Sequence, residues 1–520
     1  MHDPRALRAV VARGTVALAI GLCGCSTSPS THEDGPDFGE ETDDPTDGTD
    51  PTTPLPARFE VKLVANGVSG TQRVNFALPL PAKAIADGAA IRVLAGSTEL
   101  AVGHRALASY PDGSPRSVQL QVDVDVTAHS FLTVELGVAS AASLELAPVA
   151  GTLTGSGNDV SPKVWALLPS EVLAASTLVG PIVPRASVTG TALDAWSQLC
   201  DYDRWGTDAF IAGAASRDVW LFDRVTAMYR GYAITGELSP LRSAYREASI
   251  YRAGMTVSNG ATTAIAVPGA STDLKYHYSQ GVALHYLLTG DDRFREVAEA
   301  ISARVAGMWD PDYNGTDEFW TERHAGFALL AHEWAARVTD DRAVEITGRA
   351  DTAVSAFLAA QLAPRFGQGA TDARCFAHTA TAHGESWGTN GCSPWMSAIL
   401  ADGLDAHARR VGGTRADDVR TALARLARIV AREGRDSTGR PLYWMGVGGS
   451  GDEVDAYDEH WGESAYIVAL GWTASGRTEQ PLKDAADQLV AGLRSRGEVG
   501  QVRSFNWQCR SAVMAPALLQ

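Results

Sequence analysis

Five tight-turn signals divide the C-terminal half of this chain into pairs of apolar-periodic segments. The turns are Thr235-Gly236-Glu237, Thr289-Gly290-Asp291, Thr339-Asp340-Asp341, Gly412-Gly413-Thr414 and Ser475-Gly476-Arg477. They recur at intervals of about 50 to 75 residues, the length of a helical hairpin plus a return loop. The repeat therefore predicts a ring of helical hairpins, an incomplete or complete (α/α)5-6 toroid, over residues 191–520.

The two segments of each predicted hairpin differ in how their apolar residues are distributed. The segments before the turns, which include 216–235, 281–288, 326–338, 396–411 and 465–472, are apolar over a broad face. Those after the turns, such as 294–305 and 419–430, carry charges on one side. We expect the first set to be buried inner helices and the second set to be outer helices. The segment 507–519 is expected to close the ring as a further inner helix.

Residues 57–150 alternate apolar and polar side chains with a period of two, as in Phe59-Glu-Val-Lys-Leu-Val and Ser117-Val-Gln-Leu-Gln-Val. Turn signals such as Asn66-Gly67 separate these runs. The pattern predicts a small antiparallel β domain, either a sandwich or a barrel. The expected fold class is α+β and multidomain, with residues 151–190 as a connecting segment.

Three stretches of this β domain carry a resemblance to a known family. They are Phe76-Ala-Leu-Pro-Leu-Pro, Ile91-Arg-Val-Leu and Ala108-Ser-Tyr-Pro-Asp-Gly-Ser-Pro-Arg-Ser-Val. The domain resembles the N-terminal β domain of the exo-rhamnogalacturonan lyase (PcRGLX/YetA-like) family. The resemblance implies secretion, a β domain packed against an (α/α) toroid, and polysaccharide lyase activity. The chain departs from that family by being short after residue 150, and no family catalytic motif can be matched residue by residue.

The first 25 residues have the pattern of an export signal. Three arginines precede the short apolar stretch 15–22, which is too short to span a bilayer. The stretch ends in Leu22-Cys23-Gly24-Cys25, which resembles a bacterial lipobox with Cys25 as the acylated residue; the alternative is an ordinary cleaved signal. Residues 26–56 hold nine acidic and no basic side chains and are expected to be a disordered linker. The predicted location is the outer membrane or cell surface, through a lipid anchor.

Charge and cysteine content narrow the function further. The whole chain has 44 Lys and Arg residues and 61 Asp and Glu residues, and without residues 1–56 the numbers are 41 and 51. This excess of acidic side chains in residues 57–520 argues against nucleic-acid binding. Four cysteines remain beyond the signal, for which the expected disulfides are Cys375–Cys392 and Cys200–Cys509; the alternative is four buried thiols. The second disulfide would tie together the two ends of a closed ring. We expect a monomer.

The loops before the inner helices are long, and alternation places all of them on one face of the ring. They are 256–275, 308–319, 362–392 and 433–459. Tryptophan and tyrosine offer flat faces to sugar rings, while histidine, arginine and carboxylates orient polar groups and transfer protons. The candidate catalytic residues are Tyr278, Arg323, His324, His383, Glu385, Tyr457 and His460. The candidate substrate-binding residues are Asp203, Trp205, Arg224, His277, Trp320, Trp387, Asn390 and Trp461. They predict a polysaccharide or oligosaccharide site that requires no cofactor.

A polysaccharide lyase is the favoured interpretation of this site. β-Elimination needs a group that neutralises the uronate carboxylate, a base for the C5 proton and an acid for the leaving oxygen. Arg323, Asn390 or a protonated histidine fits the first role, His383 or Tyr278 the second, and Tyr278 or Tyr457 the third. The β-domain resemblance favours this assignment.

Two alternatives remain open. A glycoside hydrolase would use two carboxylates that flank the scissile bond, and Glu385 with Asp458 or Glu463 is the natural pair. The many loop carboxylates favour this alternative. A sugar-binding surface lipoprotein without catalysis would keep only the aromatic side chains.

One acidic loop has part of a calcium-binding pattern. Asp310, Asp312 and Asn314 occupy the first, third and fifth positions, and Gly315 the sixth. The twelfth position is Thr321, and the expected glutamate is displaced by one, to Glu322. A structural Ca²⁺ at this loop is therefore a weak prediction, with a simple acidic turn as the alternative.

Overall fold

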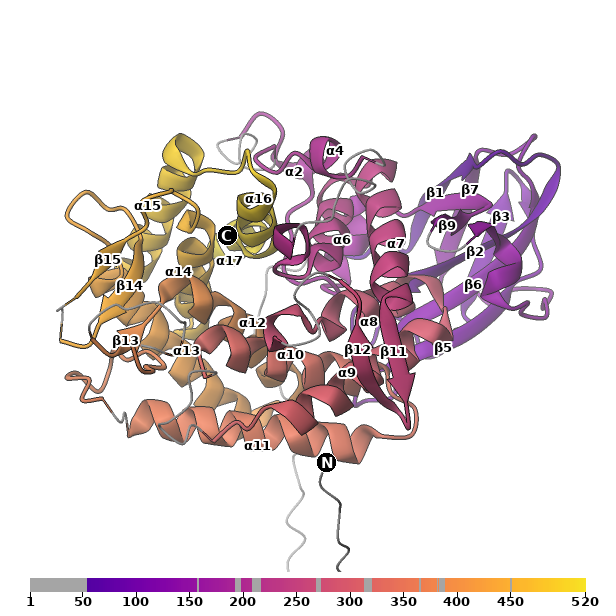
Figure 1. Ribbon diagram of the computed structural model, residues 1–520. Helices are drawn as coiled ribbons and strands as arrows, with labels where there is room; N and C mark the ends of the chain where they lie inside the picture. The colour runs from indigo at the N-terminus through magenta and orange to yellow at the C-terminus, as the bar shows by residue number, and fades with distance from the viewer. Residues whose placement is uncertain are drawn as a thin grey trace, which may run out of the picture. The chain divides into compact units, whose positions relative to one another are not determined.

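The chain is α+β, with antiparallel sheets in its N-terminal part and helical hairpins after them (Figure 1). The computed structural model describes residues 54–156, 159–191, 198–207, 217–267, 273–312, 320–363, 366–380, 382, 389–448 and 451–520. All of these belong to one compact unit, Pro45–Gln520. This arrangement confirms the fold class predicted from the two kinds of periodicity.

Two antiparallel sheets form the N-terminal domain. One has the strand order β10-β1-β7-β3-β4 and the other the order β2-β6-β5. The strands are β1 (Arg58–Ala65), β2 (Thr71–Pro79), β3 (Ile91–Ala95), β4 (Thr98–Glu99), β5 (Gly103–Ser109), β6 (Pro115–Asp125), β7 (Phe131–Leu136) and β10 (Val164–Leu167). Strand β10 pairs with β1 from Lys62–Leu167 to Ala65–Val164, so the segment expected to be a plain connection contributes a strand to the larger sheet. A separate hairpin, β8 (Leu153–Ser156) and β9 (Asp159–Pro162), precedes it.

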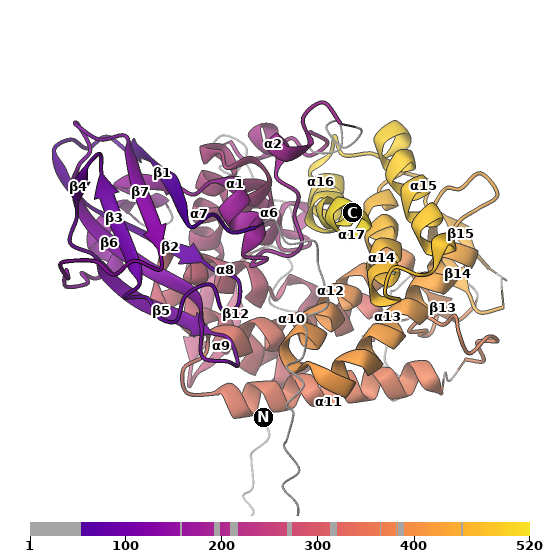
Figure 2. The same cartoon turned by 180° about the vertical axis from the view of Figure 1, so that it is seen from behind.

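Residues 117–122 of the central strand β6 are all buried, although their sequence alternates, whereas Asp123 and Asp125 are exposed. The sheet packs on helix α8 (Ser279–Thr289) (Figure 2), and buried polar side chains meet that helix: Ser117 donates to the carbonyl of Leu287 at 2.6 Å, and Asn75 of β2 donates to that of Thr289 at 2.8 Å. The side chains of Gln119 and Gln121 in turn donate to the side-chain oxygen Oδ1 of Asn75. The last carbonyls of a helix have no partner within the helix, and these side chains supply one. A period-two pattern cannot distinguish such a buried polar face from a solvated one.

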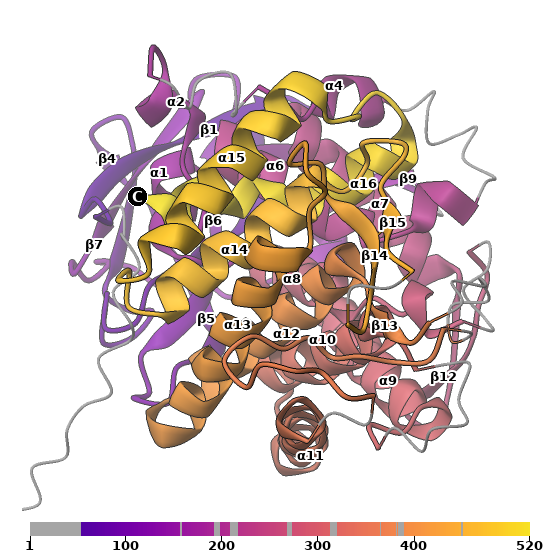
Figure 3. The same cartoon turned by 90° about the vertical axis from the view of Figure 1, so that its left-hand side faces the viewer.

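Six helices contact one another in cyclic order: α6 with α8, α8 with α10, and so on to α16, which contacts α6 (Figures 1 and 3). They are α6 (Arg224–Thr235), α8, α10 (Glu322–Val338), α12 (Pro394–Val411), α14 (Trp461–Ala474) and α16 (Val502–Ser511). Nearly every residue of α8 and α14 is buried, as expected for inner helices. The predicted last helix, 507–519, is divided in the structure: α16 begins at Val502 and contacts both α14 and α6, and α17 (Ala515–Leu519) packs beside α14.

Five longer helices pack outside these six and are buried on one face. They are α7 (Leu238–Ala253), α9 (Asp292–Met308), α11 (Ala343–Leu362), α13 (Gly413–Glu433) and α15 (Gln480–Arg496). Each predicted turn joins an inner helix to the outer helix that follows it, which confirms all five hairpins. Shorter elements fill the connections: helices α1 (Ser170–Ala175), α2 (Arg185–Val188) and α4 (Tyr202–Trp205), and strands β11 (Met255–Ser258), β12 (Ala261–Ile265), β13 (Gly391–Cys392), β14 (Leu442–Gly446) and β15 (Glu453–Val454).

Two disulfides hold the helical region, as predicted. Cys200–Cys509 joins the segment before α4 to α16, and Cys375–Cys392 closes part of the long connection between α11 and α12. No helix in the described part of the chain is both long and apolar enough to cross a membrane.

Gly290, at the turn between α8 and α9, offers a test of how the β domain docks. It adopts a φ of 74°, and a Cβ there would overlap the side chain of Gln119. Its carbonyl also accepts a hydrogen bond from Arg105 of β5 at 2.8 Å. Gly290→Ala should therefore destabilise the protein by about 1–3 kcal/mol more than Gly476→Ala, whose φ of 67° imposes similar strain but whose Cβ would meet no atom within 4 Å. Thermal unfolding of both variants measures the difference, and equal losses would show that docking tolerates the added methyl group.

Candidate active site at the centre of the helical ring

Aromatic and ionisable side chains gather where the inner helices begin. Each inner helix contributes one or two residues at or near its N-terminal end, or within the helix in the case of α16, and strand β14 contributes one more. We call this set the central cluster: Phe222 before α6, Tyr278 before α8, Arg323 and Phe327 on α10, Trp395 on α12, His460 before α14, Trp507 on α16, and Tyr443 on β14. The long loops predicted before α8, α10, α12 and α14 lead into these same ends.

The rings of the central cluster are in mutual contact. The rings of His460, Trp395 and Trp507 all contact one another: the centroid of His460 lies 4.7 Å from that of each tryptophan, and the two tryptophan centroids are 5.3 Å apart. Phe222 lies 5.8 Å from Trp395 and 5.0 Å from Trp507, and Tyr443 lies 5.5 Å from His460. Aromatic packing of this kind fixes each ring in one orientation. The centre of the ring is therefore a rigid apolar setting for the few ionisable groups within it.

His460 is fully buried, with 0% of its surface exposed. Neither imidazole nitrogen has a hydrogen-bond partner among the described residues, and Nδ1 lies 3.6 Å from the Oε1 atom of Glu463. Burial lowers the pKa of His460 well below 6.5, and the cations Arg503 and Arg323 lower it further. His460 is therefore a neutral imidazole at neutral pH, with unused hydrogen-bonding capacity.

Glu463 is the second unpartnered group. Both of its carboxylate oxygens are buried, and no hydrogen bond to them exists within the described ranges. Burial raises the pKa of Glu463 well above 4.5, and the neighbouring Asp455 and Glu459 raise it further. The environment therefore favours the protonated acid, one helical turn from His460.

Arg323 is the third unpartnered group, and it is a cation. Its side chain lies 5.3 Å above the ring of Trp395 and is only 5% exposed. It forms no hydrogen bond or ion pair with any residue that the structure describes, and its Nε atom is buried without a partner. Burial lowers its pKa, while Asp273 and three tyrosines oppose that effect. A buried guanidinium without a counter-ion costs several kcal/mol, which makes it a candidate anion site.

The side chain of His324, next to Arg323, stabilises the start of helix α10 through polar contacts. Its Nδ1 atom lies 2.8 Å from the Thr321 hydroxyl and its Nε2 atom 3.2 Å from Asp273. Lys275 pairs with the same carboxylate at 2.6 Å. Burial lowers the pKa of His324 to about 4, so it remains a neutral bridge at neutral pH. These contacts give His324 a positioning role.

The hydroxyl of Tyr278 is committed to the backbone. It donates to the carbonyl of Trp220 at 2.6 Å and accepts from the amide of Phe222 at 2.9 Å. Phe222 and Asp223 both have positive φ angles, so this hydroxyl holds a strained turn that directs Phe222 into the central cluster. Burial raises the pKa of Tyr278 well above 10, which disfavours it as a base.

Tyr278→Phe should therefore lower the stability of the protein, in addition to any effect on catalysis. The substitution leaves one buried carbonyl and one buried amide unpaired, at a cost of about 1–3 kcal/mol. Thermal unfolding should show this loss, while Tyr457→Phe, whose ring is 72% exposed, should unfold like the wild type. An unchanged midpoint for Tyr278→Phe would mean that the turn does not depend on this hydroxyl.

Most of the other predicted residues hold loops or helices outside the central cluster. Arg224 pairs with Glu247 at 2.9 Å, and His277 accepts from Arg304 at 2.8 Å. Among the tryptophans, Trp205 packs on Phe505, Trp320 stacks with Trp309, and Trp461 lies under Arg496 and donates to Asp458. The side chain of Asn390 accepts a hydrogen bond from the amide of Ala380. Asp203 and Tyr457 are exposed. The hydrolase candidate Asp458 also pairs with Arg440. His383, Glu385, Trp387 and Cys25 lie outside the described residues.

The sequence interpretation missed Trp395, Trp507, Phe222 and Tyr443, and named Glu463 only as an alternative. Phe222, Tyr443, Trp395 and Trp507 lie at or near the start of a helix, on a strand or within a helix, whereas most of the predicted residues precede the inner helices. Trp395 is the second residue of α12, after a proline at the first position, which is a recognisable helix start. That signal could have placed Trp395 at the same end as Arg323.

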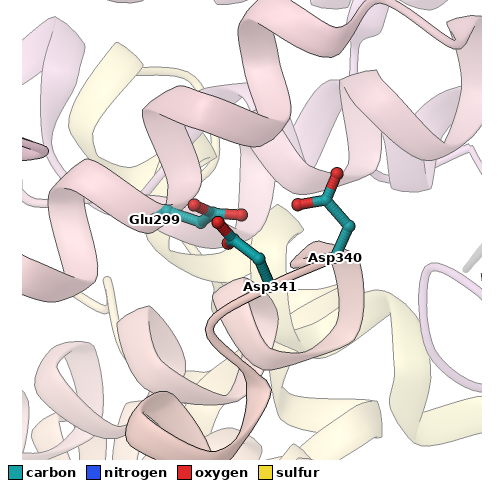
Figure 4. Close-up of side chains that lie close together, drawn as sticks. All are labelled: Glu299, Asp340 and Asp341. Atoms are coloured by element: carbon teal, nitrogen blue, oxygen red, sulfur yellow. The ribbon is translucent and has the colours of Figure 1, made fainter.

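Two groups of oxygen ligands are relevant to metal binding. At the predicted calcium loop, the amide of Asp312 donates to the carboxylate of Asp310 at 2.8 Å, while Asn314 lies outside the described residues, so calcium there stays a prediction. Elsewhere, Glu299 of α9 and Asp340 and Asp341 of the α10–α11 turn bring carboxylate oxygens within 4.8 Å of one another (Figure 4). Asp340 already pairs with Arg295 at 2.6 Å, and both aspartates are exposed.

No protein-family model and no curated protein matches this chain. Among solved structures, the chain is similar to a glycosyl hydrolase family 88 protein from Bacteroides vulgatus, with a TM-score of 0.43 and 10% identity over 65% of this chain and 99% of that one. It is also similar to a polysaccharide lyase, with a TM-score of 0.38 and 12% identity over 62% of this chain and 96% of that one. These values are too low to transfer a residue role or an activity to this chain.

Proposed function

We propose that this chain is a carbohydrate-active enzyme that cleaves a uronate-containing polysaccharide by β-elimination, in a complete (α/α)6 toroid formed by the six inner helices. The observation that carries the proposal is Arg323, a buried guanidinium with no partner among the described residues. A carboxylate matches the forked geometry of a guanidinium and would neutralise it. Several inner helices also direct their N-terminal ends toward this region, and helix N-termini favour negative charge.

In the proposed reaction, Arg323 binds the uronate carboxylate and stabilises the negative charge that develops when the C5 proton leaves. His460 takes this proton on Nε2, the nitrogen farther from Glu463. The C4–oxygen bond then breaks as the C4–C5 double bond forms, and the leaving oxygen takes a proton from an acid, for which Tyr443 is the candidate. Because His460 is enclosed here, the partly buried Tyr443 has to swing outward to admit the substrate.

A glycoside hydrolase is the second candidate, and one observation favours it. The raised pKa of Glu463 keeps a carboxylic acid protonated at the centre of the ring, as a general acid requires. The second carboxylate would be Glu385, as the sequence suggests. Arg323 serves equally well in this mechanism, because it would still bind an acidic sugar.

Product analysis separates these functions. The purified protein is incubated with a panel of uronate-containing and neutral polysaccharides, and both ultraviolet absorbance and reducing ends are followed. Unsaturated, absorbing ends establish the lyase, while reducing ends without absorbance establish the hydrolase. Binding without either product leaves a sugar-binding protein, and activity on neutral polysaccharides alone would contradict a role for Arg323 in carboxylate binding.

The low pKa of His460 predicts the pH range in which activity declines on the acidic side. A general base acts in its neutral form, and lowering its pKa extends that form to more acidic solution. The acid limb of kcat/KM should therefore lie below pH 6.5. Initial rates between about pH 4 and pH 8 test this expectation. A limb at or above pH 6.5 would exclude His460, in the environment observed here, as the base.

We also propose that the mature protein is attached to the membrane by a lipid on Cys25, with residues 26–56 as the tether. The two disulfides are consistent with an extracellular location. Mass spectrometry of the N-terminal peptide tests the lipid directly, and a cleaved peptide without acyl groups would contradict the anchor.

A further inference from the structure

A cavity of about 190 Å³ lies outside the ring of inner helices, between the β domain and the first helical hairpins. The β-domain side consists of Val149, Leu153 and Val160, and helices α7, α8 and α9 supply the other walls. The hairpin β8–β9 contacts α7 along this edge (Figure 1). None of the central-cluster residues lines this cavity, so it is a separate site.

An unpaired cation faces this cavity. Arg252, near the end of α7, forms no hydrogen bond or ion pair with any residue in the described ranges, and its Nε atom is buried without a partner. The ring of Phe294, 5.4 Å from the guanidinium carbon, forms an adjoining wall. A partly buried guanidinium beside an empty space indicates a ligand with negative charge.

Hydrogen-bond donors surround the same space. The Nδ1 atom of His285 lies 2.7 Å from the hydroxyl of Tyr229, and no described residue bonds to its Nε2 atom. Ser249 and Tyr245, which both carry a hydroxyl group, also line the cavity. If Tyr229 donates to Nδ1, then Nε2 carries the proton and can donate to a ligand. Burial lowers the pKa of His285 to about 3, so this ring contributes no charge.

The charges around the cavity sum to one excess positive charge. Asp291 and Arg293 form an ion pair at 2.6 Å and cancel each other, which leaves Arg252 uncompensated. A singly charged anion would complete this balance, whereas a dianion would be repelled by Asp291. A planar carboxylate also matches the guanidinium fork.

We propose that this cavity binds a small monocarboxylate that carries one ring, such as a single uronic acid. The size follows from the volume, because cavities of about 150 Å³ accommodate benzene. Phe294 and the three apolar residues of the β domain would contact the ring, and Arg252 would bind the carboxylate. The proposal does not depend on the reaction at the central cluster.

Calorimetric titration of the full-length protein with sodium glucuronate and sodium benzoate tests the proposal, with glucose and inorganic phosphate as comparison ligands. The titrations are made on an Arg323→Gln background, so that the central cluster cannot account for carboxylate binding. We expect one site for at least one of the two carboxylates, and none for glucose. Arg252→Gln should weaken binding by at least about tenfold, the value of a charge-assisted hydrogen bond.

Two further variants keep this test decisive. Arg242→Gln removes an exposed arginine of the same helix and should leave binding unchanged. Ser249→Leu fills the cavity without altering its charge and should abolish the binding of both carboxylates. No binding of either carboxylate, or binding that survives both Arg252→Gln and Ser249→Leu, would overturn the proposal. Binding of phosphate more tightly than both carboxylates would overturn the assignment of the ligand class.

Discussion

Arg323→Gln should reduce kcat/KM on a uronate polysaccharide by about two to three orders of magnitude without lowering the thermal stability of the protein. The loss in rate follows because removing one partner of a buried charge pair costs about 2–5 kcal/mol, and each 1.4 kcal/mol is tenfold. The stability should stay the same or rise, because the folded protein no longer buries a guanidinium that has no counter-ion among the described residues. An ordinary structural arginine would behave in the opposite way, since its loss would lower stability.

The opposite signs of these two effects make the experiment informative. Arg242→Gln, on the exposed face of α7, is the matched control and should change neither quantity. Reducing the carboxyl groups of the polysaccharide to alcohols should remove the difference between the wild type and Arg323→Gln. If the variant unfolds at a lower temperature and retains its rate, Arg323 is a structural residue, and the proposed function loses the observation that carries it.

The helical architecture could be predicted from local signals because each hairpin is a local structure. A turn such as Thr289-Gly290-Asp291 needs a positive φ at its glycine and an N-cap at its aspartate, and both requirements are written in adjacent residues. Contact between the two ends of the helical region was also predictable, because the Cys200–Cys509 disulfide and the apolar segment near the C-terminus both pointed to it. The β8–β10 strands and the buried polar face of β6 were not, because each depends on a partner distant in sequence.

The candidate site could be predicted only in part, for a related reason. The sequence placed long loops before α8, α10, α12 and α14, and it named Arg323 and His460. It could not determine which of the many aromatic and histidine side chains turn inward, because that depends on where each helix begins relative to its neighbours. Tyr278 and His324 have suitable chemistry, but backbone and loop contacts engage them. Trp395 and Trp507 contact His460 although neither lies in a long loop.

The two disulfides should differ strongly in their effect on stability, and the difference tests the closure of the ring. In the chain-entropy account, a disulfide stabilises the folded state by restricting the unfolded chain, and its effect grows with the length of the closed loop. The separations are 309 residues for Cys200–Cys509 and 17 for Cys375–Cys392. Losing the first should cost on the order of 5 to 6 kcal/mol and losing the second about 3 kcal/mol. All four cysteines are buried, so the small cavities left by alanine are comparable.

The measurement is thermal unfolding of the double variants Cys200→Ala/Cys509→Ala and Cys375→Ala/Cys392→Ala at one fixed scan rate, because a chain of this size can unfold irreversibly. The first variant should unfold at the lower temperature, since only it frees α16 from the segment before α4. If the ring is already open at α16, this helix can detach with little loss of free energy, and the Cys200–Cys509 disulfide adds little stability. The two variants should then unfold at the same temperature or in the reverse order. That result would contradict a closed ring in solution, and with it the contacts of His460 with Trp395 and Trp507 on which the proposed chemistry depends.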